Sequence, residues 1–456
     1  MTTKQIDTPL YDTIANKFEI TSLRGNQDHL NDIRKKAFSI FESEKLPSIK
    51  NEEWRFANVM PYLKKEYKWE IEKTEFTQAE LAKISERINT HLASIKSAHK
   101  EVVEDNYLIV NINGQWCKEL SHLPSSDDLT VVQISEANDL PSFQKHFGKV
   151  AVMEKNGFVA LNTALFVDGL FIEAPKNKKI DKPLHFVNVY LSDSNLWVQP
   201  RNLVVLNPFA ELEIIETVLE DDHNSEIFIN GVTEVALAEN AHFYHYDLQT
   251  GREGMRFVQR IEASQMKHSN YSNYTFTLPG SDFVRNNLAI HLEEPELVSH
   301  MYGLYIGADS QLIDNHTEVH HKKPRGNSNQ LYKGVLLDKA KAVFNGKIFV
   351  YEDAQLTDAF QQSNNILFSD KATVNAKPQL EIFADDVKCS HGMTIGQLDK
   401  EAMFYLQSRG ISEESARNIM VNAFVFDVSQ KVENAALRSY LEQRINEIMN
   451  QATPVF

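Results

Sequence analysis

The chain has 456 residues, of which 63 are Asp or Glu and 47 are Lys or Arg, so its net charge near pH 7 is −16. This length exceeds one ordinary compact core and predicts either two or three domains or one long solenoid. The strong negative charge opposes binding to nucleic acid, whose phosphate backbone is also negative. A hydrophobic content of 42% excludes a wholly disordered chain.

No segment of the sequence resembles a membrane-directing signal. The first ten residues lack the apolar stretch of a signal peptide, and no run of about 18 apolar residues occurs. Two cysteines, Cys117 and Cys389, are too few for a disulfide framework or a four-thiolate metal site. We therefore expect a cytoplasmic protein with no membrane partner.

We expect residues 1–150 to form a mostly helical region with a short hairpin. Apolar residues recur at three- and four-residue steps in 31–41 and 77–98, a spacing that predicts helices. The mixed segment 51–56 between them is interpreted as a docking segment. Residues 107–116 predict a strand that reaches an Asn-Gly turn at 113–114, which is a strong hairpin signal.

From about residue 180 to 390, short apolar stretches alternate with turn residues, and one turn pattern recurs. The small residues that end this turn follow one another at a near-constant step of roughly 30 residues, apart from one longer interval between the second and the third. They are Ala210, Ala241, Ser281, Ser310, Ala340 and Ala372. Such a repeat predicts a parallel β-helix, or β-solenoid, over 151–396. The alternative is a β-sandwich or double-stranded barrel, in which turns recur every 8 to about 12 residues.

Helical patterns return in 397–456. A first helix should stop near Gly410, because glycine suits the left-handed conformation that ends helices. Ser412 is a suitable N-cap for a second helix, and a third is expected over about 432–449. These helices could cap the end of the solenoid, dock a partner, or do both.

Several catalytic and nucleotide-binding motifs are absent from the sequence. We find no G-x-x-x-x-G-K-[ST] loop, no G-x-G-x-x-G after a predicted strand and no G-x-S-x-G elbow. The chain is therefore not expected to bind a nucleotide through a standard phosphate loop.

Cys389 and His391 form the sharpest local feature, within Asp-Asp-Val-Lys-Cys-Ser-His-Gly at 385–392. On a strand, residues i and i+2 share a face, so the thiol and the imidazole would lie side by side. They suit Fe, Zn or Cu(I) as ligands, but two ligands do not complete a tetrahedral site. The alternatives are a buried Cys beside a hydrogen-bonded His, and a nucleophile pair.

A second candidate is the H-x-E-x-H pattern of His316, Glu318 and His320. On a strand these three side chains share a face and could form a three-ligand metal site. The alternative is an outward polar face of one solenoid coil, and this alternative is favoured.

Several blocks of the sequence, in order, resemble the SufD subunits of the SUF iron–sulfur cluster assembly machinery. They are ALNTALFVDG at 160–169, SNQLYKGVL at 328–336, 344–359, PQLEI at 378–382, and DDVKCSHGMTIG at 385–396 followed by QLDKEAMFYLQSRGI. The related SufB subunits carry a different, Glu- and His-containing pattern at the Cys-Ser-His block and are usually richer in cysteine.

The resemblance implies a right-handed parallel β-helix and a scaffold subunit that is not an enzyme. It implies pairing with a SufB-like subunit, with homodimers possible when the chain is alone. It also implies that a SufC-like ABC-type ATPase docks on the C-terminal helices, where we single out Phe404, Tyr405, Ile419 and Phe424. Cys389 and His391 match the family's interface positions, where a transient iron ion or iron–sulfur cluster would be shared with SufB. No family motif supports His316, Glu318 and His320.

Overall fold

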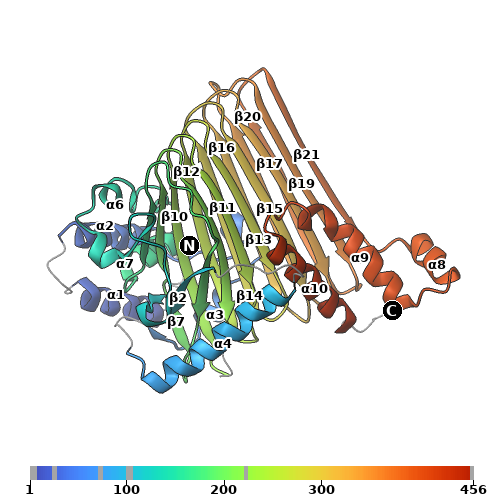
Figure 1. The fold of residues 1–456 in the computed structure, drawn as a ribbon, viewed down its shortest axis with the longest axis horizontal. Coiled ribbons are helices and arrows are strands. Elements are labelled where there is room, and N and C mark those ends of the chain that lie inside the picture. The colour runs from blue at the N-terminus through green and yellow to red at the C-terminus, as the bar shows by residue number, and fades with distance from the viewer. Residues whose placement is uncertain (1–7, 23–27, 70–74, 99–105, 220–223, 452–456) are drawn as a thin grey trace, which may run out of the picture.

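The computed structural model describes residues 8–22, 28–69, 75–98, 106–219 and 224–451. They form a β-solenoid of about eight coils, with helices towards both ends of the chain (Figure 1). The predicted mainly β class with terminal helices is therefore confirmed. The sandwich and barrel alternatives are wrong, because successive strands of each sheet pair in parallel from β6 and β5 onward.

Each coil contributes one strand to each of two sheets, so strands alternate between them along the chain. Sheet A contains β1 (Lys68–Trp69), β4 (Thr130–Gln133), β5 (Leu170–Ala174), β7 (Leu196–Val198), β8 (Arg201–Leu206), β10 (Ile227–Leu237), β12 (Met255–Gln265), β14 (Phe283–Leu292), β16 (Leu312–His321), β18 (Lys341–Val350) and β20 (Thr373–Ile382). Sheet B contains β2 (Tyr107–Ile112), β3 (Gln115–Trp116), β6 (Leu184–Val189), β9 (Glu211–Leu219), β11 (His242–Gln249), β13 (Asn270–Thr277), β15 (Val298–Gly307), β17 (Asn327–Leu336), β19 (Thr357–Leu367) and β21 (Val387–Gly396).

The recurring turns fall on two different edges of the solenoid. Ala210 and Ala241 end turns that lead from sheet A into sheet B, whereas the four later residues end turns that lead from sheet B into sheet A. The longer interval between Ala241 and Ser281 is the point where the predicted series changes edge. Steps within one edge match the coil length, as in the pairing of His242 with Asn270 on the next coil.

The main core lies between the two sheets, where inward side chains of both sheets interlock. It includes Ile290 of β14, Tyr332 of β17 and Phe344 of β18, each at most 2% exposed. Residues paired on neighbouring parallel strands point to the same face of their sheet. Each coil therefore repeats the side-chain directions of the coil before it. The direction of any side chain can therefore be taken from its partner one coil earlier.

Helices precede and cover the first coils. Their bounds are α1 (Thr8–Ser22), α2 (Asp28–Glu44), the 3-10 turn η1 (Glu52–Trp54), α3 (Met60–Leu63), α4 (Gln78–Ser97), the 3-10 turn η2 (Lys118–Leu120), α5 (Ile134–Ala137), α6 (Pro141–His146) and α7 (Gly157–Leu165). The helices predicted over 31–41 and 77–98 correspond to α2 and α4. The predicted hairpin is also confirmed, since β2 and β3 flank Asn113 and Gly114, both with positive φ.

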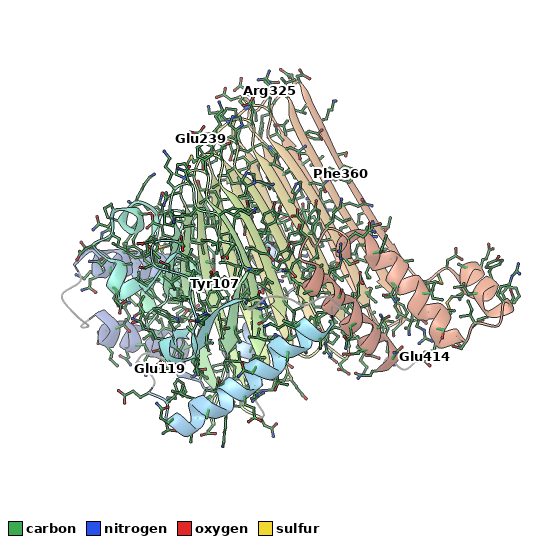
Figure 2. The ribbon with its side chains drawn as sticks, in the orientation of Figure 1. Tyr107, Glu119, Glu239, Arg325, Phe360 and Glu414 are labelled. Carbon is green, nitrogen blue, oxygen red and sulfur yellow. The ribbon has the colours of Figure 1, made fainter. Side chains whose placement is uncertain are left out.

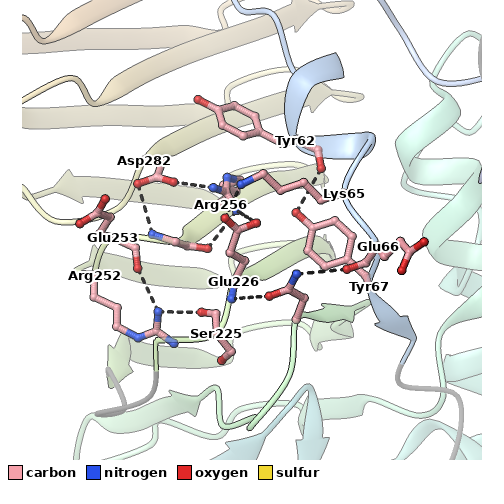
Figure 3. Close-up of polar contacts among 12 residues, drawn as sticks. Tyr62, Lys65, Glu66, Tyr67, Ser225, Glu226, Arg252, Glu253, Arg256 and Asp282 are labelled. Atoms are coloured by element: carbon pink, nitrogen blue, oxygen red, sulfur yellow. Dashed lines mark hydrogen bonds and ion pairs between the residues drawn. The ribbon is translucent and has the colours of Figure 1, made fainter.

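The N-terminal region is fastened to the outer face of sheet A by a buried arginine (Figure 3). Arg256 of β12 donates to Asp282 Oδ2 at 2.7 Å and lies 3.2 Å from Glu226 Oε2. Lys65 pairs with the same Glu226, and the guanidinium stacks 4.6 Å from the centre of the Tyr62 ring. Charge pairing and ring stacking thus join the segment after α3 to two coils.

The segment 51–56, interpreted as a docking segment, binds further along the same face. The Glu53 carboxylate accepts from Lys347 Nζ at 2.6 Å and from Asn345 Nδ2 at 2.7 Å, and lies 3.2 Å from His316 Nδ1. Its backbone carbonyl accepts from Arg285 Nη1 at 2.6 Å. One acidic residue therefore links η1 to β14, β16 and β18.

This docking contact should weaken in acid. The hydrogen bond with His316 and the charge of Lys347 lower the pKa of Glu53 from 4.5 to about 2. Its contribution to stability is therefore complete above pH 4.5 and is lost as the pH falls towards 2. We expect Glu53→Gln to lower the free energy of unfolding at pH 7 and to flatten its decline in acid, as measured by urea denaturation over this pH range. An unchanged acid profile would contradict this account.

A fully buried ion pair fastens the segment before α7. Arg201 of β8 and Glu234 of β10 pair on the outer side of sheet A, and both side chains are 0% exposed. The Glu234 carboxylate also accepts backbone N–H groups of Gly148, Val150 and Ala151 at 2.9 to 3.0 Å. A single carboxylate thus accepts three backbone N–H groups and pairs with one buried cation.

The chain ends in α8 (Lys400–Ser408), α9 (Glu413–Ser429) and α10 (Ala435–Gln451). Gly410 has φ +85° and Ser412 accepts from the Ser415 N–H at 3.1 Å, so both predicted helix boundaries are confirmed. α9 and α10 pack on the outer face of sheet B, whereas α8 projects away from the solenoid (Figure 1). Within the described ranges, no helix combines the length and apolar character that crossing a membrane requires.

Candidate functional site

Cys389 and His391 lie on β21, the last strand of sheet B. β21 pairs with β19, and no other described strand is hydrogen-bonded to it. In this pairing Cys389 lies beside Ala359 and His391 beside Gln361. Ala359 and Gln361 are 1% and 0% exposed and point inward. Because parallel partners share a face, the thiol and the imidazole both point towards the interior at the open end of the solenoid.

The two side chains differ in their surroundings. Cys389 is half-buried and packs with Leu380 and Val387 against the last part of the core. Burial raises the pKa of its thiol, although a hydrogen bond from the Ala359 backbone opposes this rise. The thiol form is therefore favoured, and a metal ion or a base would have to displace its proton. His391 is exposed, because no further coil covers it.

Apolar side chains are exposed on the same coil as the pair. They are Ile382 (38%), Phe383 (63%), Met393 (42%) and Ile395 (42%). Phe360 of β19 is also exposed, near the free edge of the solenoid in Figure 2, but it is paired with Ser390 and so lies on the opposite face of the sheet. Contiguous exposed apolar groups of this kind mark interaction surfaces. The site is thus the uncovered end of the solenoid core rather than an enclosed pocket.

Three of the four predicted docking residues are exposed on the C-terminal helices. Phe404, Tyr405 and Ile419 are 72%, 59% and 47% exposed. Phe424 instead faces the solenoid, where Lys333 Nζ lies 4.7 Å from the centre of its ring. Phe426, which the sequence analysis did not single out, is 48% exposed on α9. Side chains on α8 and α9 therefore present an apolar surface that folding leaves uncovered.

His316, Glu318 and His320 share the outward face of β16, and both histidines have partners outside the set. His316 Nε2 lies 2.9 Å from Asp314 Oδ1, and its Nδ1 faces Glu53. His320 Nδ1 lies 3.2 Å from the Tyr351 hydroxyl, while its Nε2 is 3.9 Å from Glu318. His316 thus takes part in the contact with η1, while Glu318 and His320 lie further along the same outward polar face.

No group of three or more His, Cys, Asp or Glu side chains among the described residues is placed to hold a metal ion. Cys389 and His391 can supply one thiolate and one imidazole, which fit iron or an iron–sulfur cluster chemically. They supply only half of a tetrahedral ligand set. A complete site would need its other donors from outside the described residues.

Two family models match the chain. One, described as the SufBD core domain of SUF system FeS cluster assembly, matches residues 189–424. The chain belongs to the SufB/SufD family. The second model, described as the SufBD protein N-terminal region, matches residues 8–186. Together they cover the N-terminal helices and the solenoid, so iron–sulfur cluster assembly is the process in which this family member takes part.

Curated relatives agree with this assignment. An iron–sulfur cluster assembly SufBD family protein of Synechocystis is 29% identical over 91% of this chain and 90% of its own length. The iron–sulfur cluster assembly protein SufD of Escherichia coli is 27% identical over 75% of this chain and 79% of its own length. A SufBD family protein of Staphylococcus aureus is 23% identical over 89% of this chain and 86% of its own length.

The exposed apolar side chains on the last coil of this SufB/SufD family member were not predicted from the sequence. Met393 and Ile395 continue the alternation of Cys389 and His391, and in any earlier coil this pattern would indicate buried core. Only their place on the last strand makes them surface residues. The end of the repeat, visible at the return of helical patterns after Gly396, was the signal that could have identified them.

Proposed function

We propose that this SufB/SufD family member is a SufD-like scaffold subunit, on whose last coil nascent iron–sulfur clusters are assembled. The observation that carries this proposal is the position of Cys389 and His391 on a free edge strand within an exposed apolar surface. Two ligands at an open edge can form a complete four-ligand site when a second chain supplies the other two. The subunit is not itself an enzyme, and iron and sulfide are its cargo.

The second chain in this proposal is a SufB-like subunit. β20 and β21 present unpaired backbone groups, and an edge strand of another solenoid can bind there by extending both sheets. The surrounding apolar side chains would then become buried, and water would be excluded from the thiol and the imidazole. In the absence of SufB, a second copy of the chain would use the same end to form a homodimer.

The ATPase in this proposal is a SufC-like ABC-type subunit, bound to the C-terminal helices. Two observations support it: the chain has no phosphate loop of its own, and α8 has no buried residue. ATP-driven dimerisation of two such ATPases would move the helices that they hold and so open or close the subunit interface. We place this assembly in the cytoplasm.

Affinity purification of the tagged chain from its own cells, under anaerobic conditions, tests the proposal. We expect a SufB-like chain and an ABC-type ATPase in the eluate, together with iron and ATP hydrolysis. Recovery of the chain alone, with its own metal and its own turnover, would refute the scaffold role.

The docking helices give a sharper test. Replacing both Phe404 and Tyr405 with Glu should reduce the recovery of the ATPase at least tenfold, because two exposed aromatic anchors would be lost. The melting temperature should stay unchanged, since both side chains are mostly in solvent. The matched control is Phe209→Glu, since Phe209 is 52% exposed in a turn of the first coils. Equal recovery of the ATPase with the double variant and the control would contradict docking on α8.

A further inference from the structure

A chain of polar side chains runs through the interior of the last coils and ends beside His391. Gln361 of β19 donates through Nε2 to Gln330 Oε1 of β17 at 2.7 Å. Gln330 in turn donates to the hydroxyl of Thr317 on β16, across the space between the sheets. Gln330 and Gln361 are 0% exposed, and Thr317 is 1% exposed. Amide groups are thus stacked from coil to coil inside the core.

The chain of hydrogen bonds has a direction. Gln330 donates across the core to the preceding strand, and Gln361 donates to the preceding coil. Each amide oxygen is therefore left on the side of the next coil. Gln330 Oε1 is used by Gln361, which occupies that next coil. Gln361 Oε1 is buried and has no hydrogen-bond partner among the described residues. Leaving a buried acceptor unsatisfied is costly, so this position calls for a donor from the coil beyond.

The residue in register on that coil is His391. Paired strands of one sheet lie about 4.8 Å apart, and their paired side chains share a face. No hydrogen bond joins the two side chains in the structure, and a rotation of the exposed His391 imidazole towards the core would bring a ring N–H to the Gln361 amide. Gly346 of β18 makes room for the amide, because a Cβ there would clash with Gln361 Nε2. Glycine leaves the space that the extended glutamine side chain fills.

We propose that Gln361 is a positioning residue for His391. By accepting a hydrogen bond from one ring nitrogen, it fixes the proton on that nitrogen and leaves the lone pair on the other. The other nitrogen then faces the open end of the solenoid as a ready metal ligand. The use of this nitrogen as a metal ligand rests on the proposed function, whereas the hydrogen bond to Gln361 does not.

The test is nitrogen NMR of the full chain with ¹⁵N-labelled histidine, with His391→Gln used to assign the His391 signals. We expect the neutral imidazole of His391 to be held in one tautomer in the wild-type chain. Gln361→Met keeps the length of the side chain but removes the amide, and should give a mixture of both tautomers. Gln361→Glu should restore the single tautomer, because a protonated carboxyl group donates to Gln330 and still accepts from His391.

Gln330→Met is the matched control, since it breaks the same chain one coil earlier and leaves Gln361 Oε1 in place. It should preserve the single tautomer, which separates positioning from a general loosening of the core. An identical tautomer ratio in the wild type and Gln361→Met would overturn the proposal. So would a mixture in Gln330→Met as large as that in Gln361→Met.

Cluster formation provides a second readout. Loss of a residue that orients a metal ligand reduces metal affinity or activity by roughly 10- to 100-fold, and we expect Gln361→Met to fall in this range. If His391→Ala assembles clusters normally, the proposed function fails, whatever the tautomer result. If His391→Ala is defective while Gln361→Met keeps both the tautomer and full assembly, only the positioning role fails.

Discussion

His391→Ala should abolish most cluster assembly, with a loss of more than tenfold, while leaving the fold and the complex intact. The imidazole is exposed at the end of the solenoid, so removing it should lower the free energy of unfolding by only about 1 kcal/mol, the net contribution of one hydrogen bond such as that proposed with Gln361. Its loss nonetheless removes one of the two ligands that we propose the chain supplies. The measurement is iron–sulfur absorbance on the purified complex, with the melting temperature recorded alongside.

Ser390→Ala is the matched control for this experiment, because Ser390 lies on the same strand with its side chain on the opposite face. Cys389→Ser then tests the thiol separately, since the hydroxyl keeps the size of the side chain but is a poor ligand for iron. Normal cluster yield from His391→Ala would refute the ligand role. Normal yield from Cys389→Ser would limit the role of Cys389 to packing against Leu380.

Glu234→Ala should destabilise the chain by about 3 to 5 kcal/mol, the typical cost of breaking a buried ion pair. The substitution leaves the Arg201 guanidinium buried without its partner, and it removes the acceptor for three backbone N–H groups before α7. Unfolding by urea, followed by circular dichroism, measures the loss. We expect the outer helices to come loose before the solenoid unfolds.

The comparison variant is Glu136→Ala. Glu136 pairs with Lys118 at 3.0 Å, but both side chains are about half exposed. Pairs of this kind contribute about 1 kcal/mol or less, because water already solvates both charges. Equal losses for Glu136→Ala and Glu234→Ala would show that the buried pair has no special role in holding the N-terminal region.

The repeat and the terminal helices could be predicted from the sequence because their patterns are local. α7 could not, since all nine of its residues are buried and it has no polar face to reveal a helical period. The spacing of small residues revealed the solenoid, but it merged two series of turns. Alanine ends turns on both edges, so residue type alone does not tell which edge a turn occupies.

The candidate site was predictable only in part. The i, i+2 spacing of Cys389 and His391 places both side chains on one face, as the strand pairing confirms. The role of Gln361 depends on a partner one full coil away, which only the register reveals. One partner of His316 likewise comes from η1, near the start of the chain, so the H-x-E-x-H pattern alone does not reveal that its first residue takes part in a docking contact.

The two ends of the solenoid are unlike, and this difference sets a limit on growth. At the N-terminal end, the sheets finish in the short antiparallel strands β3 and β4, of two and four residues. At the other end, ten-residue strands remain free. A filament needs a binding surface at both ends of every unit, whereas a unit with one such surface can bind only one partner through it. We therefore expect the chain to pair through its C-terminal end rather than to add repeatedly into fibres.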